Sequence, residues 1–269
     1  MTRSNRRSTL ATWLAVLGGV AIALGVLGLW AQRTLGDADT FAALAGDILE
    51  DPRIRTELAV VIVEPALVNA PEEIREQRAF IVSTTASVLG DARFVPLFED
   101  VLRRAHQRLV EGEGPVRLEL ERPLDLVVLE VEPISPELAA ELDAIDAPSV
   151  VVVSAAQADR LRGFVAVERA VSVILLVAGT LLVLVAVIRG GARALVPFGA
   201  TLAGACLVLF GLLLLGRSLL LSGIHPQSRA AAAEAAWDIV IADLRTALLV
   251  SAAAGALALV AGAVLGRRA

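Results

Sequence analysis

ERAVSVILLVAGTLLVLVAVIRGGARALVPFGATLAGACLVLFGLLLLG (residues 168–216) contains two apolar runs joined by a short link that carries Arg189 and Arg193. Each run approaches or exceeds the roughly 20 residues that a helix needs to cross the hydrocarbon core of a bilayer. Two more runs of this kind lie near the ends of the chain, so the predicted transmembrane helices are 10–31, 168–188, 195–216 and 246–266. The chain is therefore predicted to be a mainly α-helical membrane protein with four transmembrane helices.

Arginine flanks these spans on one side. The N-terminal tail (1–9), the link (189–194) and the C-terminal tail (267–269) all carry Arg and contain no Asp or Glu. By the positive-inside rule, these three segments face the cytoplasm. We therefore expect a multi-pass protein of the cell (plasma) membrane with both termini cytoplasmic, and with residues 32–167 and 217–245 on the outer side.

The first span could be a cleavable signal peptide or an uncleaved signal anchor. Its apolar part runs for about 20 residues, longer than the usual 7–15 of a signal peptide, and no Ala-x-Ala pattern follows it. Trp13 and Trp30 would be separated by about 25 Å of helix, close to the distance between the two interfacial belts. These features favour a signal anchor.

The predicted extracytoplasmic domain (32–167) is acidic, with 25 Asp and Glu against 13 Arg and a net charge of about −12. Such a surface disfavours nucleic acid as a partner. The single cysteine, Cys206, lies in the third span, so a hydrophobic core must stabilise the domain without a disulfide. All 24 basic residues are Arg, a bias typical of high-GC bacterial genomes.

Most of this domain has a helical pattern. Asp39 is expected to cap a first helix, and Asp51 with Pro52 a second, which Pro65 ends or kinks. A third helix is predicted over 71–90, and Asp91 is expected to cap the most regular one, which ends at Gly112. The residues expected to face inward are Phe41, Leu44, Ala45, Ile48 and Leu49 in the first helix; Ile54, Leu58, Val61 and Ile62 in the second; Ile74, Ile81 and Val88 in the third; and Phe94, Leu97, Phe98, Val101, Leu102, Ala105 and Leu109 in the fourth.

After residue 115 the pattern changes to a period of two. Val116, Leu118 and Leu120 alternate with charged residues, as in a strand with one buried face. Val150–Val153 is the other β-branched run, and the two segments are expected to pair as a small two-stranded β element. The domain is therefore predicted to be α-rich α+β.

Further helices are expected around this β element. Residues 124–131 and the segment after Ser135 suit short helices, and Ser154 with Gln157 forms a capping box. The helix that begins there is expected to continue through Arg169 into the second span.

The outer loop (217–245) contains a predicted amphipathic helix at 228–244. Trp237, Val240, Ile241 and Leu244 repeat at helical spacing, and most of the charged residues lie on the other side. Such a helix either lies in the membrane interface or packs on the extracytoplasmic domain, and its balanced charges favour packing on protein.

Small residues recur at helical spacing within the spans, where they let helix backbones approach closely. The residues expected to serve helix packing are Gly18, Ala21, Gly25 and Gly28 in the first span and Gly255 and Gly262 in the fourth, with Ala200, Gly204 and Gly211 in the third. The spacing suits contacts within one bundle and equally contacts between copies, so a homo-oligomer is an alternative. Intramolecular packing is favoured because the chain has four spans.

Residues that could carry chemistry are few. The span centres hold no Asp, Glu, Arg or His, which disfavours an ion-coupled transporter. His106 and His225 are candidate functional residues, although His106 borders an apolar helix face, His225 sits in a turn, and neither has zinc-site spacing. Asp37 and Asp39 could form a cation pair, but Asp39 is already explained as a cap. We therefore expect no catalytic residue, cofactor or metal.

Short features of the chain carry a family resemblance. They are Asp37–Phe41 soon after Trp30, Glu50-Asp51-Pro52, Ala105–Leu109 followed by the strand at Val116, and Val150–Ser154 leading to Leu161. With the order of one anchor, an acidic outer domain and three C-terminal spans, the chain resembles an uncharacterised family of actinobacterial integral membrane proteins. The resemblance implies the topology and a cell-envelope setting, and it implies no catalytic residue.

These observations predict a non-enzymatic envelope protein whose extracytoplasmic domain mediates protein–protein contact or sensing. Its surroundings would be the lipid bilayer and an envelope or membrane protein partner. The alternative is a component of a small-solute transporter or channel, because an oligomeric pore does not require buried charges.

Overall fold

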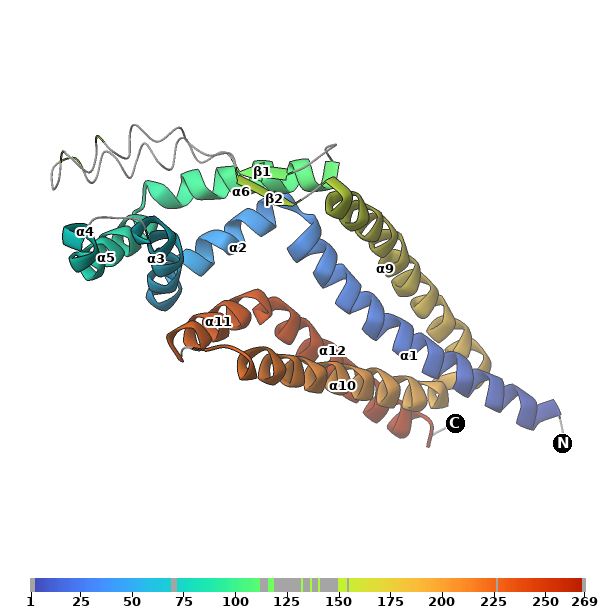
Figure 1. Cartoon of the computed structure of the whole chain (residues 1–269). Coiled ribbons are helices and arrows are strands. Elements are labelled where there is room, and N and C mark those ends of the chain that lie inside the picture. The colour runs from blue at the N-terminus through green and yellow to red at the C-terminus, as the bar shows by residue number, and fades with distance from the viewer. Residues whose placement is uncertain are drawn as a thin grey trace. The chain divides into compact units, whose positions relative to one another are not determined.

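The computed structural model describes residues 3–68, 72–111, 116–118, 150–153, 155–225 and 227–267, together with residues 132, 136 and 140. The chain is mainly α-helical (Figure 1). Its elements are α1 (Arg3–Gly36), α2 (Ala38–Glu50), α3 (Pro52–Leu67), α4 (Glu72–Glu76), α5 (Arg78–Leu89), α6 (Phe94–Glu111), β1 (Val116–Leu118), β2 (Val150–Val153), α9 (Ala155–Gly190), the 3₁₀ turn η1 (Gly191–Ala194), α10 (Leu195–Ser222), α11 (Gln227–Val240) and α12 (Ala242–Leu265).

Three helical stretches of the described chain are long and apolar enough to cross a membrane. They are Thr9–Gly36, Ala170–Ser222 and Ala242–Leu265. The middle stretch has 53 residues and contains most of α9, the turn η1 and all of α10. Gly191 adopts a positive φ of 64° at this turn, where α9 arrives and α10 runs back from it (Figure 1).

The chain divides into two compact units. Unit 1 consists of Met1–Arg33, Val165–Leu220 and Ile241–Ala269, and it contains the membrane-length apolar helices. Unit 2 consists of Thr34–Phe164 and Leu221–Val240. As predicted, α9 is one unbroken helix through Arg169, and residues of this helix belong to both units.

Glycine pairs bring the helices of unit 1 into backbone contact. A Cβ atom on Gly18 would lie 2.9 Å from the carbonyl oxygen of Gly179, where α1 meets α9. A Cβ atom on Gly199 would lie only 2.3 Å from the carbonyl oxygen of Gly255, where α10 meets α12. Only glycine fits at such crossings because the facing backbone occupies the place of the side chain.

The core of unit 2 lies among α2, α3, α5 and α6. Its buried side chains are Leu49, Ala59, Val63, Leu67, Val82, Val88, Leu89 and Phe94. A second cluster, in which Ala232 and Ala235 of α11 pack against Ile54 of α3, adds α11 to this unit. The helix of the 217–245 loop therefore packs on protein, on the side of α3 that carries Ile54.

The strands β1 and β2 form an antiparallel two-stranded sheet. Val116 faces Val153 and Leu118 faces Val150, with an irregularity in the register between Val116 and Arg117. The helices predicted at 124–131 and after Ser135, the cap at Ser154 and the helix end at Gly112 lie outside the described residues.

Two predicted helix starts are confirmed. The Asp51 carboxylate accepts a 2.8 Å hydrogen bond from the Arg53 N–H, with Pro52 in the first turn of α3. The Asp91 carboxylate accepts from the Arg93 N–H at 2.8 Å, and the Asp91 carbonyl accepts from the Phe94 N–H at 3.0 Å. Both caps bond to neighbours in sequence, which is why the pattern identified them.

The cap predicted at Asp39 is wrong. The helix begins one residue after Asp37, whose carboxylate accepts a 2.8 Å hydrogen bond from the Thr40 N–H. Asp37 has extended backbone geometry (φ −98°, ψ 122°), as an N-cap requires, whereas Asp39 is already in the first turn. Asp37 and Asp39 are the same residue type two positions apart, so the sequence gives no reason to prefer one as the N-cap. The backbone conformation identifies Asp37.

The helices α3 to α5 depart further from prediction. Val61 and Ile62 are exposed, not inward, and the buried positions beside them are Ala59 and Val63. The segment is apolar on every side, so its period cannot select a face. In addition, α3 continues past Pro65 to Leu67, and the helix predicted over 71–90 is divided at Gln77 into α4 and α5.

The amphipathic helix predicted at 228–244 is also divided. It ends at Val240, and Leu244 belongs to α12, which begins at Ala242. The buried positions of α11 are the small residues Ala232 and Ala235, while Trp237 is half-buried. Close packing against α3 favours small side chains. A prediction based on the most hydrophobic residues, such as Trp237 and Val240, therefore selected a different face of the helix.

Candidate functional site

His106, one of the two candidate histidines, is buried in unit 2 with 5% of its surface exposed. Its Nε2 lies 2.8 Å from the carbonyl oxygen of Leu35, in the last turn of α1. A carbonyl can only accept, so Nε2 carries the proton and donates. Leu35 has one of the four terminal carbonyls that α1 cannot satisfy internally, and His106 supplies its donor from α6.

The other ring atoms of His106 face the interior. The imidazole lies 4.8 Å from the ring of Phe41 on α2, centroid to centroid. Nδ1 is buried and has no hydrogen-bond partner among the described residues. A base so enclosed cannot reach a substrate in this conformation, and the ring instead ties the end of α1 to α2 and α6.

Charged groups surround this histidine. Hydrogen bonds from the Thr40 N–H and hydroxyl lower the pKa of Asp37 below its usual value, with a smaller contribution from the charge of His106. Asp39 accepts a 2.7 Å bond from Arg103 Nε across 64 residues of sequence. The two acids therefore have different roles, Asp37 as a helix cap and Asp39 as an ion-pair partner of α6.

His225 lies elsewhere. It is exposed in the turn after α10, two residues beyond Gly223. The described residues contain no group of three or more His, Cys, Asp or Glu arranged to hold a metal ion. The two histidines are thus not brought together.

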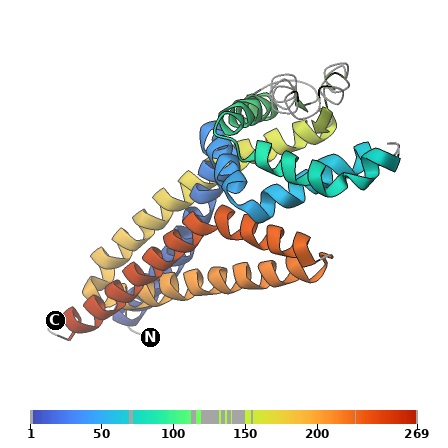
Figure 2. The same cartoon turned by 90° about the vertical axis from the view of Figure 1, so that its left-hand side faces the viewer.

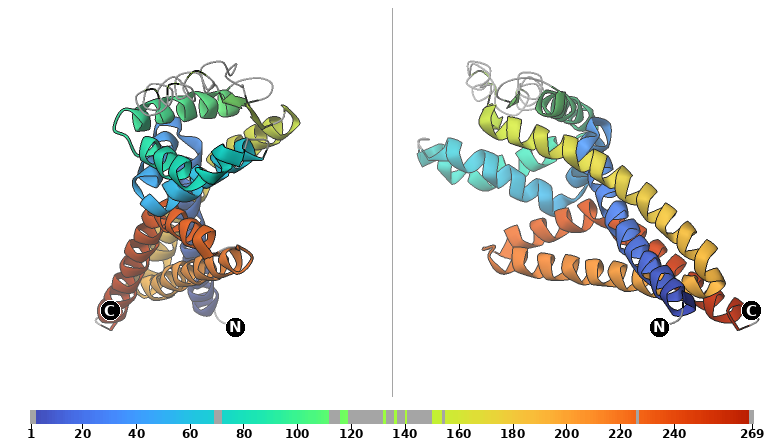
Figure 3. Two further views of the ribbon diagram at one scale, coloured as in Figure 1. Left: turned by 60° about the vertical axis from the view of Figure 1, so that its left-hand side comes forward. Right: turned by 90° about the vertical axis from the view of Figure 1, so that its right-hand side faces the viewer.

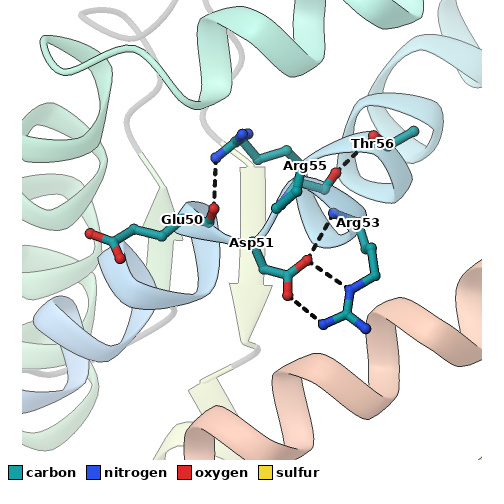
Figure 4. Close-up of polar contacts among 6 residues, drawn as sticks. Glu50, Asp51, Arg53, Arg55 and Thr56 are labelled. Atoms are coloured by element: carbon teal, nitrogen blue, oxygen red, sulfur yellow. Dashed lines mark hydrogen bonds and ion pairs between the residues drawn. The ribbon is translucent and has the colours of Figure 1, made fainter.

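The turn between α2 and α3 is the second polar cluster of unit 2 (Figure 4). Asp51 caps α3 and also accepts from Arg53 Nε at 3.1 Å and Nη2 at 2.6 Å. The hydrogen bond from the Arg53 side chain is the main cause that lowers the pKa of Asp51 to about 2. A carboxylate held by a cap and a two-pronged ion pair stays ionised over most of the pH range.

Arg55 completes this turn from the other side. Its Nη1 donates to the carbonyl oxygens of Leu49 at 2.8 Å and Glu50 at 3.0 Å, two terminal carbonyls of α2 (Figure 4 draws the second bond). The guanidinium passes over Gly90, where a Cβ atom would lie 2.8 Å from Arg55 Nε. The sequence indicated the Asp51 cap, but it contained no signal for Arg55, whose bonds span five and six residues.

Charged residues also connect α11 to α3. Arg229 Nε lies 3.6 Å from Glu57 Oε2. The pKa of Arg53 is raised chiefly by Asp51 and, more weakly, by Glu234 and Asp238 of α11. Acidic side chains of α11 thus lie close enough to Arg53 of α3 to stabilise its positive charge.

Exposed apolar side chains are unevenly distributed in unit 2. Among its described residues, the large apolar side chains with high exposure are Leu35 and four between residues 61 and 80: Val61 (56%), Ile62 (52%), Val68 (72%) and Phe80 (53%). We refer to these four as the α3–α5 apolar residues. Four large apolar side chains exposed within 20 residues of sequence are candidates for a contact surface.

The predicted packing residues have distinct positions. A Cβ atom on Gly25 would lie 2.6 Å from Leu176 Cγ, and one on Gly262 would lie 2.9 Å from Leu195 Cβ. A Cβ atom on Gly179 would lie 3.1 Å from Ala21 Cβ, and Gly28 is half-buried. On the third span, by contrast, Cβ atoms on Gly204 and Gly211 would meet nothing within 4 Å.

No protein-family model matches this chain, and no curated protein or solved structure is detectably similar to it.

Proposed function

We propose that the chain is a non-enzymatic, multi-pass protein of the cell envelope whose extracytoplasmic part makes protein–protein contacts or senses a partner. In this proposal unit 1 anchors the chain in the bilayer, and unit 2, with its α-rich α+β composition, provides the contact surface. The family proposed from the sequence, an actinobacterial group of membrane proteins, has the same order of segments.

Four crossings of the membrane are part of the proposal. The 53-residue apolar stretch would extend about 80 Å as one helix, far beyond the roughly 30 Å of a hydrocarbon core. We therefore count it as two spans joined at η1. The Arg residues at both termini and beside η1 support an orientation with these segments in the cytoplasm.

The observation that carries the contact function is the exposure of the α3–α5 apolar residues. A folded unit gains stability by burying such side chains, by roughly 1.5–3 kcal/mol each, and here they remain at the surface. Arg78 and Glu64, within the same stretch of sequence, form an exposed ion pair between α5 and α3. An apolar surface with polar groups among it suits a protein partner.

Site-specific photocrosslinking in cells would test this function. A photoreactive side chain at Ile62 or Phe80 should give an adduct of one defined mass with a protein. The exposed polar position Gln107, on α6, is the matched control and should give none. The neighbouring change Val61→Glu should abolish the Ile62 adduct because a charge on the surface prevents its burial.

Equal adducts at Ile62 and Gln107, or an Ile62 adduct that persists in the Val61→Glu protein, would contradict a contact role for the α3–α5 apolar residues.

The alternative, a solute pathway through the spans, has a separate test. Thr180 is exposed on α9, and its hydroxyl donates to the Leu176 carbonyl of the same helix at 2.7 Å, as expected for a hydroxyl that does not line a hydrated path. We expect Thr180→Val, Thr201→Val and Ser251→Ala together to complement a deletion strain fully. Loss of complementation by this normally expressed triple variant would favour transport.

A further inference from the structure

The helix ends of unit 1 that surround η1 gather in one place. A Cβ atom on Gly190 would lie 3.0 Å from Ala11 Cβ of α1, and one on Gly262 of α12 would lie 3.0 Å from the carbonyl oxygen of Ala192. Figures 2 and 3 show the start of α1, the turn between α9 and α10 and the end of α12 at the same end of this unit. Segments far apart in the sequence therefore share one surface.

The charged side chains described at this end are arginines: Arg189, Arg193 and Arg267 are exposed there. The only acids in the unit 1 segments are Glu168 and Asp243. Asp243 is in the first turn of the 24-residue α12, about 36 Å along the helix from Arg267, and Glu168 is about 32 Å along α9 from Arg189.

Arg193 is held in place at this end. Its Nε donates to the carbonyl oxygen of Gly266, at the end of α12, at 3.2 Å. A Cβ atom on Gly266 would lie 2.9 Å from Arg193 Cγ, so the absence of a side chain lets the arginine approach. This bond uses one of the five N–H groups of a guanidinium.

Exposed apolar residues adjoin the arginines in sequence. Ile188, next to Arg189, is 74% exposed, and Leu265, two residues before Arg267, is 49% exposed. Guanidinium groups bind phosphate oxygens in pairs, while neighbouring apolar side chains suit acyl chains. A ligand that combines an anionic phosphate with acyl chains fits this combination better than a free anion or a neutral lipid.

We propose that this end of unit 1 is a binding surface for anionic phospholipid, with Arg189 and Arg267 as phosphate contacts beside an Arg193 positioned by α12. The inference rests on the proposed membrane topology, which places this end at the cytoplasmic leaflet. It is independent of any partner of unit 2. Basic groups at that surface are attracted to an anionic membrane.

Thermal unfolding of the full chain in neutral detergent, titrated with dioctanoyl phosphatidylglycerol or dioctanoyl phosphatidylcholine, tests this surface. The anionic lipid should raise the Tm at a midpoint concentration roughly tenfold or more below that of the zwitterionic lipid. Arg189→Gln with Arg267→Gln should remove this difference, whereas Arg189→Lys with Arg267→Lys should keep most of it. Soluble glycerol phosphate should have little effect because it has no acyl chains.

The matched control changes two exposed arginines of unit 2, Arg75→Gln with Arg104→Gln, and should preserve the lipid preference. Equal midpoints for the two lipids would overturn the proposal, as would a control variant that loses the preference equally. Stabilisation by glycerol phosphate at the same concentration would assign the surface to free phosphate instead. These outcomes leave crosslinking at Ile62 unaffected, so the two proposals fail separately.

Discussion

Asp51 shows how one residue combines a local and a charged interaction. Its carboxylate caps α3 through the Arg53 N–H and pairs with the Arg53 guanidinium. The folded pKa of about 2 lies below the ordinary value of 3.8. Because the folded pKa is lowered, this stabilisation is fully present above pH 3.8 and is lost as the pH falls from there toward 2.

We therefore predict that Asp51→Ala lowers the free energy of unfolding by about 0.5–2 kcal/mol near neutral pH through loss of the cap. Asp51→Asn should keep the cap and lose only the ion pair. Thermal unfolding of the full chain between pH 6 and pH 2.5 would measure both variants. The difference between wild type and Asp51→Asn should shrink in the acid range, and a constant difference would contradict the assigned pKa.

A second residue-scale prediction concerns His106, whose Nε2–H satisfies the Leu35 carbonyl. His106→Leu should destabilise unit 2 by about 1–3 kcal/mol because the carbonyl loses its donor. His106→Gln, whose amide nitrogen can reach the same acceptor, should recover part of this loss. His225→Leu applies the same change to an exposed position and should stay within about 0.5 kcal/mol of wild type in thermal unfolding.

At the scale of helices, two of the glycines of α10 lie in opposite environments. Gly199 faces the backbone of Gly255 on α12, whereas Gly204 has nothing within 4 Å of its Cβ position. Gly199→Ala should therefore separate α10 from α12 and cost roughly 1–3 kcal/mol, as overpacking does. Gly204→Ala, the same change on the same helix, should be neutral or slightly stabilising. Equal Tm values in detergent would mean that the two helices do not cross at Gly199.

At the scale of the whole molecule, the proposed topology predicts which residues face outward. In a Cys206→Ser background, Ser83→Cys on α5 should react with an impermeant maleimide in intact cells. Arg267→Cys, after α12, should react only when the cells are opened. Both positions are exposed, so accessibility within the fold does not limit labelling. Labelling of Arg267→Cys in intact cells without labelling of Ser83→Cys would contradict the proposed orientation and support the opposite one.

Features that depend only on neighbouring residues could be predicted from the amino-acid sequence. The membrane-length apolar helices follow from composition over about 20 residues. The caps at Asp51 and Asp91 follow from hydrogen bonds to residues only two positions away. The unbroken course of α9 follows from the absence of proline in its residues.

Which helix faces and which distant residues meet depends on the packing of the helices, and the sequence pattern does not specify it. Residues 58–63 of α3 are all apolar and could bury either side, and the contacts of α3 with α5 and α11 left Val61 and Ile62 exposed. His106 and Leu35 are 71 residues apart, and Asp39 and Arg103 are 64 apart. Helical periodicity carries no information over such separations because each pair depends on how whole helices pack. For this reason the contacts of Arg55 and Gly199 and the ion pair of Asp39 could not be predicted from the sequence.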